Sequence, residues 1–338
     1  ENAALVAADP TNGDILVMVG SRDYFDKEID GNFNIALAER QPGSSFKPFV
    51  YATAFKKGYT PETVVFDLKT QFSTHCSPDN FTSEDNCYAP DNYDHQFRGP
   101  VTFKNALAQS LNIPAVKALY LAGIDESLKT ARDLGITTLT NRDQYGLTLV
   151  LGGGEVKLLE MVGAYGAFAN EGERAELTGI LRIEDNQGNV LQETEPKLSR
   201  VLDRDITLQI SDILSDNVAR TPLFGANSAL YFPGRDVAAK TGTTNDKRDA
   251  WVVGYTPNLV VGAWAGNNDN TSMNEISGLI ITPLWREFMD VALEKIPVKT
   301  FAKAPRTPDN IKPVLRGVWF DPSELVVDDP ENGGRIDV

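Results

Sequence analysis

The sequence predicts an α/β protein of the α+β type, in which a mainly antiparallel central sheet is flanked by helices and interrupted by an all-helical insertion. Strand-like apolar runs lie near the two ends of the chain, in about residues 1–40 and 230–296. Helical patterns fill most of the segment between them, about residues 60–200. The simplest way to bury both sets of strands is to join them in one sheet that the helices cover.

The N-terminal part is predicted to form a strand hairpin and then a helix. Residues 3–8 and 15–19 are apolar, and the segment between them contains a proline and an Asn-Gly pair, which favour a turn. A helix is predicted to begin at about Ser44, because Pro48 lacks an N–H group and is tolerated only in the first turn. This helix is predicted to end before Gly58.

The middle of the chain is predicted to form successive helices. Thr102 can cap the first of them, and Pro114 lies at the start of the second. The helical patterns cover residues 103–110, 114–123, 125–134, 156–170 and 205–218, and a hairpin is predicted within residues 180–191.

Strand patterns return near the C-terminal end, over residues 237–243, 250–255 and 258–265. A helix is predicted over residues 284–296, with an apolar stripe formed by Leu284, Phe288, Val291 and Ala292. We therefore predict one domain over residues 1–296, followed by a peripheral Pro-rich tail over residues 297–338.

The composition is that of a globular protein with an acidic surface. The chain has 338 residues and a net charge of −15, which repels phosphate backbones, so nucleic acid is not expected as a partner. No apolar run approaches the roughly 18–20 residues that a membrane span needs. The chain begins at Glu1 rather than Met, so we expect a domain cut from a longer protein, in which any anchor or targeting segment would lie upstream.

The two cysteines, Cys76 and Cys87, lie in one polar loop and favour a local disulfide, which indicates an oxidising compartment. Two unrelated free thiols are the alternative. The chain has only two histidines, whereas a zinc site needs about four ligands, so no metal site is expected.

Three short motifs carry the chemistry that the sequence suggests. One S-x-x-K motif runs from Ser44 to Lys47, and one K-T-G motif runs from Lys240 to Gly242. The S-x-N pattern occurs three times, beginning at Ser110, Ser215 and Ser272. Each motif alone is weak, and their ordered combination is much stronger.

The spacing of Ser44 and Lys47 suits nucleophilic catalysis. A serine is a weak nucleophile until a base removes its proton, and residues three apart on a helix share one face. Lys47 becomes such a base only if burial or a second cation lowers its pKa, and Lys240 could supply that cation. In the strand around Lys240, Gly242 leaves room for an extended peptide to pair with the backbone.

Together these residues resemble the transpeptidase domain of a class A penicillin-binding protein, which implies the fold shared by penicillin-binding proteins and serine β-lactamases. The resemblance runs from about residue 3 to residue 296. The strings that carry it are RQPGSSFKPF at 40–49, SLNIPAV at 110–116, LGGGEV at 151–156, KTGTTND at 240–246 and RDAWVVGYTP at 248–257. The first and the last of these strings favour the bifunctional, class A enzymes over the monofunctional ones.

The resemblance also selects among the three S-x-N patterns. Ser110 and Asn112 occupy a family-like position between the S-x-x-K and K-T-G motifs. Ser215 begins the literal S-D-N string but lies within an amphipathic helix pattern shortly before Lys240, and Ser272 follows K-T-G, which is the wrong order. We therefore predict that Ser110 and Asn112 belong to the site.

The implied reaction is acyl transfer. Ser44 would attack the D-Ala-D-Ala bond of a peptidoglycan stem peptide, and Lys47 would take its proton. Ser110 would pass a proton to the leaving D-Ala, while Asn112 and Lys240 hold the network. An amine from a second stem peptide would then resolve the acyl-enzyme into a cross-link, with a possible carboxypeptidase side activity.

The K-T-G strand is implied to bind the substrate. The backbone N–H groups of Ser44 and Thr243 would form the oxyanion hole. The hydroxyls of Thr241 and Thr243 would hold the terminal carboxylate beside Gly242. A β-lactam would acylate Ser44 in the same way, and no cofactor or metal is implied.

The resemblance further implies an upstream glycosyltransferase domain, an upstream membrane anchor and an extracytoplasmic location on the outer face of the cytoplasmic membrane. Two alternatives share the fold. A β-lactamase-like hydrolase of class A would carry an E-x-x-L-N string, which does not occur in this sequence. A β-lactam-binding sensor remains open, because the complete motif residues are compatible with acylation alone.

Overall fold

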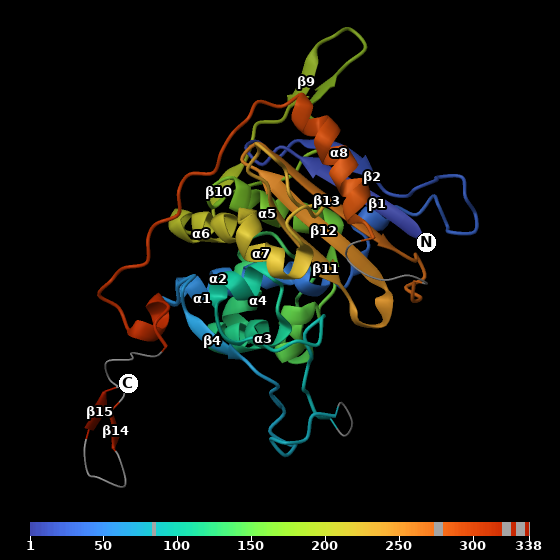
Figure 1. Ribbon diagram of the computed structural model, residues 1–338. Helices are drawn as coiled ribbons and strands as arrows, with labels where there is room; N and C mark the ends of the chain where they lie inside the picture. The colour runs from blue at the N-terminus through green and yellow to red at the C-terminus, as the bar shows by residue number, and fades with distance from the viewer. Residues whose placement is uncertain (83–85, 274–279, 320–325, 329–334, 338) are drawn as a thin grey trace.

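The computed structural model describes residues 1–82, 86–273, 280–319, 326–328 and 335–337. A five-stranded antiparallel sheet joins strands from both ends of the chain in the order β11-β12-β13-β1-β2 (Figure 1). Its strands are β1 (Asn2–Ala8), β2 (Ile15–Val19), β11 (Ala238–Thr243), β12 (Asp249–Thr256) and β13 (Leu259–Gly266). The predicted union of the end strands is confirmed, with β1 paired directly to β13.

Helices cover both faces of this sheet. The alternate residues Ala4, Val6 and Ala8 of β1 belong to one apolar cluster, whereas Leu5 and Ala7 belong to the other. The first cluster contains α1 (Lys47–Lys56), α5 (Leu158–Ala169) and α6 (Arg204–Ser215), and the second contains α8 (Thr282–Glu294). Burial on both faces explains why β1 is an almost continuous apolar run rather than an alternating one.

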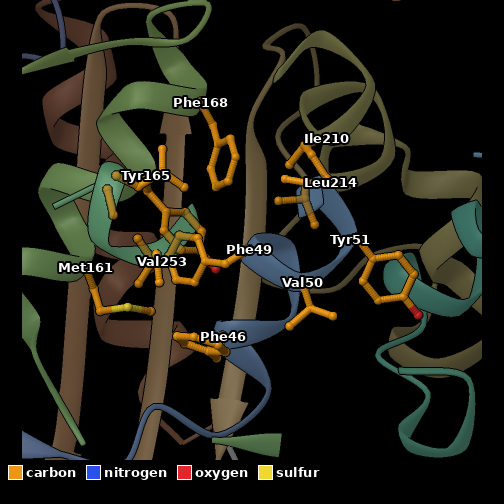
Figure 2. Close-up of a cluster of buried hydrophobic side chains, with 14 of the residues drawn as sticks. Phe46, Phe49, Val50, Tyr51, Met161, Tyr165, Phe168, Ile210, Leu214 and Val253 are labelled. Atoms are coloured by element: carbon orange, nitrogen blue, oxygen red, sulfur yellow. The ribbon is translucent and has the colours of Figure 1, made fainter. Parts of the chain in front are cut away.

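Helix α1 lies at the centre of the larger cluster, and its residues 47–55 are all buried. Figure 2 shows the Phe49 side chain among aromatic rings of α5 and of the turn before α1. Its ring centroid lies 5.1 Å from that of Phe46, 5.7 Å from that of Tyr165 and 5.9 Å from that of Phe168. A helix buried on every side is held rigidly by its neighbours, which matters because the S-x-x-K motif lies at its start.

The remaining helices form the lower part of the molecule in Figure 1 or connect it to the sheet. They are α2 (Phe103–Ala108), α3 (Asn112–Ala122), α4 (Ile124–Asp133) and α7 (Asn217–Phe224). Single 3-10 turns occur at η1 (Ile35–Leu37), η2 (Gly43–Phe46), η3 (Arg142–Gln144), η4 (Leu147–Leu151), η5 (Asn245–Lys247) and η6 (Pro313–Arg316).

The insertion is not purely helical, which corrects that part of the prediction. Short antiparallel pairs join β3 (Glu39–Arg40) to β6 (Val156–Lys157), β4 (Val64–Asp67) to β5 (Gly99–Thr102), β7 (Glu173–Ala175) to β10 (Leu198–Arg200), and β8 (Arg182–Glu184) to β9 (Val190–Glu193). Of these pairs, the sequence predicts only the β8–β9 hairpin. The other pairs have two to four residues per strand, too few for an alternating pattern to appear in the sequence.

The predicted apolar stripe of α8 is correct for Phe288 and Ala292, which pack against the second apolar cluster, and wrong for Leu284 and Val291. Trp285, Met289 and Leu293 are buried, whereas Leu284 and Val291 are 45% and 58% exposed. Apolar residues occupy two adjacent faces of this helix, and the sheet selects the face that carries the tryptophan. The Trp285 indole fills the space above β13 and donates a hydrogen bond to the Val261 carbonyl at 3.1 Å.

The chain after α8 runs along the outside of the helices (Figure 1). The Phe301 ring packs against Tyr255, and the Trp319 ring packs against Phe66. The described terminal strands, β14 (Val326–Asp328) and β15 (Arg335–Asp337), pair with each other. Over the described ranges, no helix combines the length and the apolar character needed to cross a bilayer.

Candidate active site

The predicted nucleophile lies in the turn that leads into α1. Ser44 is half-buried within η2, and the regular helix begins three residues later, at Lys47. The helix therefore starts slightly later than predicted, with Pro48 in its first turn, where no N–H group is required. The turn is closed by Ser45, whose N–H and hydroxyl both donate to the Pro42 carbonyl, at 3.2 and 2.7 Å.

Close backbone contacts clamp this turn between β11 and the residues after η4. A Cβ atom on Gly43 would lie 2.4 Å from the Thr243 carbonyl oxygen, and one on Gly152 would lie 2.1 Å from the Gly43 nitrogen. Both glycines also have positive φ, at 55° and 87°. A Cβ atom on Gly242 would lie 2.1 Å from the Pro42 carbonyl oxygen. Only glycines fit at these contacts, and they fix Ser44 beside the K-T-G strand.

Lys47 is fully buried behind Ser44, and its ammonium group faces the S-x-N loop. It donates to the Ser110 carbonyl at 2.6 Å, to the Leu111 carbonyl at 3.1 Å and to Oδ1 of Asn112 at 2.8 Å. The Ser110 hydroxyl lies 3.4 Å away. Among the described residues, Lys47 makes no hydrogen bond to the Ser44 hydroxyl. The expected direct contact between Lys47 and Ser44 therefore remains a prediction.

Ser110 joins the two lysines. Its hydroxyl accepts a hydrogen bond from Nζ of Lys240 at 2.7 Å, and Lys240 also donates to the Thr241 carbonyl at 3.0 Å. Ser110 has a φ of 56°, which is uncommon for a residue with a side chain. This conformation directs its carbonyl to Lys47 and its hydroxyl to Lys240. A proton relay at Ser110 requires its hydroxyl to lie within hydrogen-bond reach of Lys47 or Lys240, and the structure meets this requirement; the relay itself remains a prediction.

Burial makes both lysines weaker bases than free lysine. Burial, reinforced by the nearby Lys240 ammonium, lowers the pKa of Lys47 well below its usual range. Burial, with a smaller effect of the Arg220 guanidinium, lowers the pKa of Lys240 to about 7. A lysine that loses its proton near neutral pH can act as a general base.

Asn112 is the first residue of α3, and its side-chain Oδ1 accepts a hydrogen bond from Lys47. The side-chain NH₂ group of Asn112 donates to the Asp91 carbonyl at 2.7 Å. Asp91 belongs to the loop that carries the Cys76–Cys87 disulfide, which the structure contains as predicted. A cavity of about 390 Å³ opens beside Asn112, and Gln41, Thr148, Gly152, Asp91 and Cys87 are among the residues that line it.

The literal S-D-N string does not belong to the site. The Ser215 hydroxyl donates to the Ser211 carbonyl of its own helix at 2.7 Å. Asp216 caps the next helix by accepting from the Ala219 N–H group at 3.0 Å, so the string marks the junction of α6 and α7. The helix predicted over residues 205–218 therefore ends at Ser215. The third pattern, beginning at Ser272, has its asparagine outside the described residues.

The K-T-G strand lies at the edge of the sheet beside the nucleophile turn. Thr241 is buried and Thr243 is half-buried. Lys240 and Gly242 lie on the same face of β11 as Ala238, the face covered by α1, α5 and α6, whereas Ala239 lies on the face covered by α8. The Pro42 carbonyl occupies the space beside Gly242, so this glycine permits the close approach of the turn. The roles of Thr241, Gly242 and Thr243 in substrate binding remain predictions.

Sequence reasoning missed two contributors. Arg220 is 3% exposed and influences Lys240, but no pattern marks it as more than a helix residue. Asn92 is 2% exposed in the loop between β4 and β5 and accepts a hydrogen bond from the backbone N–H group of Asn112. The polar composition of that loop indicated only an irregular segment. Among the described residues, no group of three or more His, Cys, Asp or Glu side chains is placed to hold a metal ion.

Comparison with known proteins gives one consistent result. A family model described as "Penicillin binding protein transpeptidase domain" matches residues 3–290. The chain is 32% identical to penicillin-binding protein 2D of Bacillus subtilis, over 94% of this chain and 43% of that protein. It is 34% identical to penicillin-binding protein 1A of Aquifex aeolicus, over 96% of this chain and 42% of that protein. The chain thus spans about two-fifths of the length of these curated relatives.

Solved structures agree. The crystal structure of penicillin-binding protein 1A from Haemophilus influenzae superposes with a TM-score of 0.76 and 28% identity, over 99% of this chain and 52% of that one. PonA1 of Mycobacterium tuberculosis, solved in complex with penicillin V, has a TM-score of 0.74 at 23% identity, over 90% and 84% of the two chains, and so supports the fold. With the motif residues gathered around Ser44 and a family match across most of its length, the chain belongs to the penicillin-binding protein transpeptidase family.

Proposed function

We propose that the chain is a serine-type D,D-transpeptidase domain that cross-links peptidoglycan stem peptides through an acyl-enzyme on Ser44. One observation carries the proposal. Two buried lysines, Lys47 from the S-x-x-K motif and Lys240 from the K-T-G motif, meet at the hydroxyl of Ser110. A serine between two lysines of lowered pKa is suited to moving a proton between a nucleophile and a leaving group.

The proposed first half-reaction forms the acyl-enzyme. Neutral Lys47 takes the proton of the Ser44 hydroxyl, whose oxygen bonds to the carbonyl carbon of the D-Ala-D-Ala peptide bond. The C–N bond then breaks, and the leaving D-Ala amine takes a proton through Ser110. Asn112 holds Lys47 in place, and Lys240 holds the Ser110 hydroxyl. The same attack on a β-lactam opens its ring and leaves Ser44 acylated.

The second half-reaction uses an amine of another stem peptide. The amine loses a proton and bonds to the acyl carbon, and Ser44 recovers its proton as the cross-link forms. The backbone N–H groups of Ser44 and Thr243 are proposed to stabilise the oxyanion in both halves. The hydroxyls of Thr241 and Thr243 are proposed to bind the terminal carboxylate, with water as the acceptor in a carboxypeptidase side reaction.

The proposal extends to the setting of the domain. The class A resemblance supports an upstream glycosyltransferase domain and membrane anchor in a longer protein, since the curated relatives are more than twice the aligned length. An extracytoplasmic location is supported by the Cys76–Cys87 disulfide, because disulfides persist in oxidising compartments.

Covalent labelling with a fluorescent penicillin tests the proposal. Ser44→Ala should abolish labelling and leave the fold intact, because Ser44 is half-buried in a turn. Ser215→Ala is the matched control and should label like the wild type. Mass spectrometry should place the adduct on Ser44. Labelling that survives in Ser44→Ala would place the nucleophile elsewhere.

The fate of the acyl-enzyme separates the proposed activity from its alternatives. A D-Ala-D-Ala donor peptide should release D-Ala, and an added acceptor amine should appear in the cross-linked product. Rapid release of the penicillin adduct by water would instead indicate a β-lactamase-like hydrolase. A stable penicillin adduct with no turnover of any donor peptide would indicate a sensor.

A further inference from the structure

Asn92 makes a set of buried hydrogen bonds beside the active site. Its Oδ1 accepts from the N–H group of Asn112 at 2.8 Å. Its Nδ2 group donates to both carboxylate oxygens of Asp67, each at 2.9 Å, and to the Gln96 carbonyl at 2.7 Å. Asn92 is 2% exposed and Asp67 is fully buried. Asn92 and Asp67 therefore form a hydrogen-bonded pair in the protein interior rather than a surface contact.

The Asp67 carboxylate determines which way the Asn92 amide faces. Burying a carboxylate is unfavourable unless hydrogen-bond donors surround it. Asp67 accepts hydrogen bonds from the side-chain NH₂ group of Asn92 and, at 3.1 Å, from the backbone N–H group of Arg98. A flipped Asn92 amide would place its carbonyl against the carboxylate. The NH₂ group must therefore face Asp67, which leaves the carbonyl to face Asn112.

The first turn of α3 depends on this carbonyl. Its N-cap residue, Leu111, makes no side-chain capping bond, so Asn92 satisfies the first N–H group from another segment. The carbonyl of the neighbouring Asp91 holds the side chain of Asn112, because it accepts a hydrogen bond from the Asn112 NH₂ group at 2.7 Å. With its NH₂ group held there, Asn112 presents Oδ1 to Lys47 at 2.8 Å.

We propose that Asn92 is a positioning residue for acylation, because its carbonyl, oriented by the buried Asp67 carboxylate, fixes Asn112 and thereby the amine of Lys47. This inference rests on the proposed function. Among the described residues, the Asn92 side chain is hydrogen-bonded to Asp67, Gln96 and Asn112, so it acts on Lys47 through Asn112. Its removal should impair the acylation step rather than the binding of the β-lactam.

Stopped-flow labelling with a fluorescent penicillin resolves these two quantities, the dissociation constant of the initial complex and the first-order acylation rate. In Asn92→Ala, the acylation rate should fall by about 10- to 100-fold, as expected for a misplaced catalytic group. The dissociation constant should change less than about threefold. Thr82→Ala is the matched control, since it removes an exposed hydrogen bond from the same loop. An acylation rate within about threefold of the wild type would overturn the proposal.

A swapped pair keeps the test decisive if Asn92→Ala folds poorly. Asn92→Asp places two carboxylates together, whereas Asp67→Asn with Asn92→Asp restores one donor and one carboxylate. The double variant should acylate at least about tenfold faster than Asn92→Asp when both are folded by circular dichroism. Equal acylation rates would overturn the proposal. If the wild type itself forms no adduct, the proposed function fails, whereas a labelled wild type with an unaffected Asn92→Ala refutes only this inference.

Discussion

Gly242→Ala is the sharpest test of how the fold holds the nucleophile. A Cβ atom at this position would lie 2.1 Å from the Pro42 carbonyl oxygen, and 3.1 Å from both the nitrogen and the hydroxyl of Ser45. The Pro42 carbonyl accepts the two hydrogen bonds that close the turn around Ser44. The added methyl group therefore presses on the atom that shapes the nucleophile turn.

The size of the displacement follows from the contact distance. A carbon and an oxygen atom need more than 3.0 Å, so the Pro42 carbonyl must retreat by about 1 Å. The turn cannot move away freely, because Gly152 backs it at Gly43. A misplacement of about 1 Å costs on the order of 100-fold in rate. Overpacking should also lower the free energy of unfolding by about 1–3 kcal/mol.

The assay is the second-order rate constant of penicillin acylation, measured together with urea unfolding. Gly179→Ala is the matched control, since a Cβ atom there meets nothing within 4 Å. We expect Gly242→Ala to remain folded and to acylate roughly 100-fold more slowly. Acylation by Gly242→Ala within about threefold of the wild-type rate would show that the turn tolerates the methyl group, and would refute the clamp.

Three further outcomes are expected. Lys240→Gln removes a positive charge near Lys47, so the pKa of Lys47 should rise. The acidic limb of the plot of acylation rate against pH should then move to higher pH, and a shift to lower pH would contradict this. Folded Lys240 has a pKa of about 7, below its unfolded value, so the unfolded state binds the extra proton above pH 7. The free energy of unfolding should therefore increase with pH there, by up to about 1.4 kcal/mol per unit more than in Lys240→Gln, as urea titrations at several pH values would reveal. Replacing Cys76 and Cys87 by serine should cost at most about 2–3 kcal/mol and leave acylation within about threefold, and abolished labelling would make the disulfide essential.

Local signals predicted much of the fold correctly. The hairpin of β1 and β2 has a turn sequence between two apolar runs, and Thr102 caps α2 by accepting from the Asn105 N–H group at 3.2 Å. The choice of Ser110 over Ser215 also agrees with the structure, although it depended on motif order and resemblance rather than on spacing. Where residue type and neighbouring sequence determine the conformation, the sequence was sufficient.

Long-range packing explains the failures. The two faces of α8 are both apolar, and only the presence of β13 selects Trp285 over Leu284. The tight contact at Gly242 depends on a turn about 200 residues earlier in the chain, so its partner could not be inferred from either segment alone. Asn92 likewise acquires its role only when the loop folds against the start of α3.

The buried cations link the chemistry of the site to the stability of the fold. Lys47, Lys240 and Arg220 are each at most 3% exposed. Within the described part of the chain, their hydrogen-bond partners are carbonyl, amide or hydroxyl groups. A carboxylate in direct contact would stabilise the charged lysines and raise their pKa values.

Neutral acceptors instead orient the amines while allowing them to lose a proton, which is what a catalytic base requires. The cost of burying these charges must be met by the surrounding core, in which α1 is enclosed by the aromatic side chains of α5 and by the sheet. Placing Lys47 on the most enclosed helix therefore serves both needs, because the packing that excludes water from the lysine also holds it at the S-x-N loop. A more exposed lysine at the same spacing from Ser44 would keep its proton at neutral pH and could not act as the base.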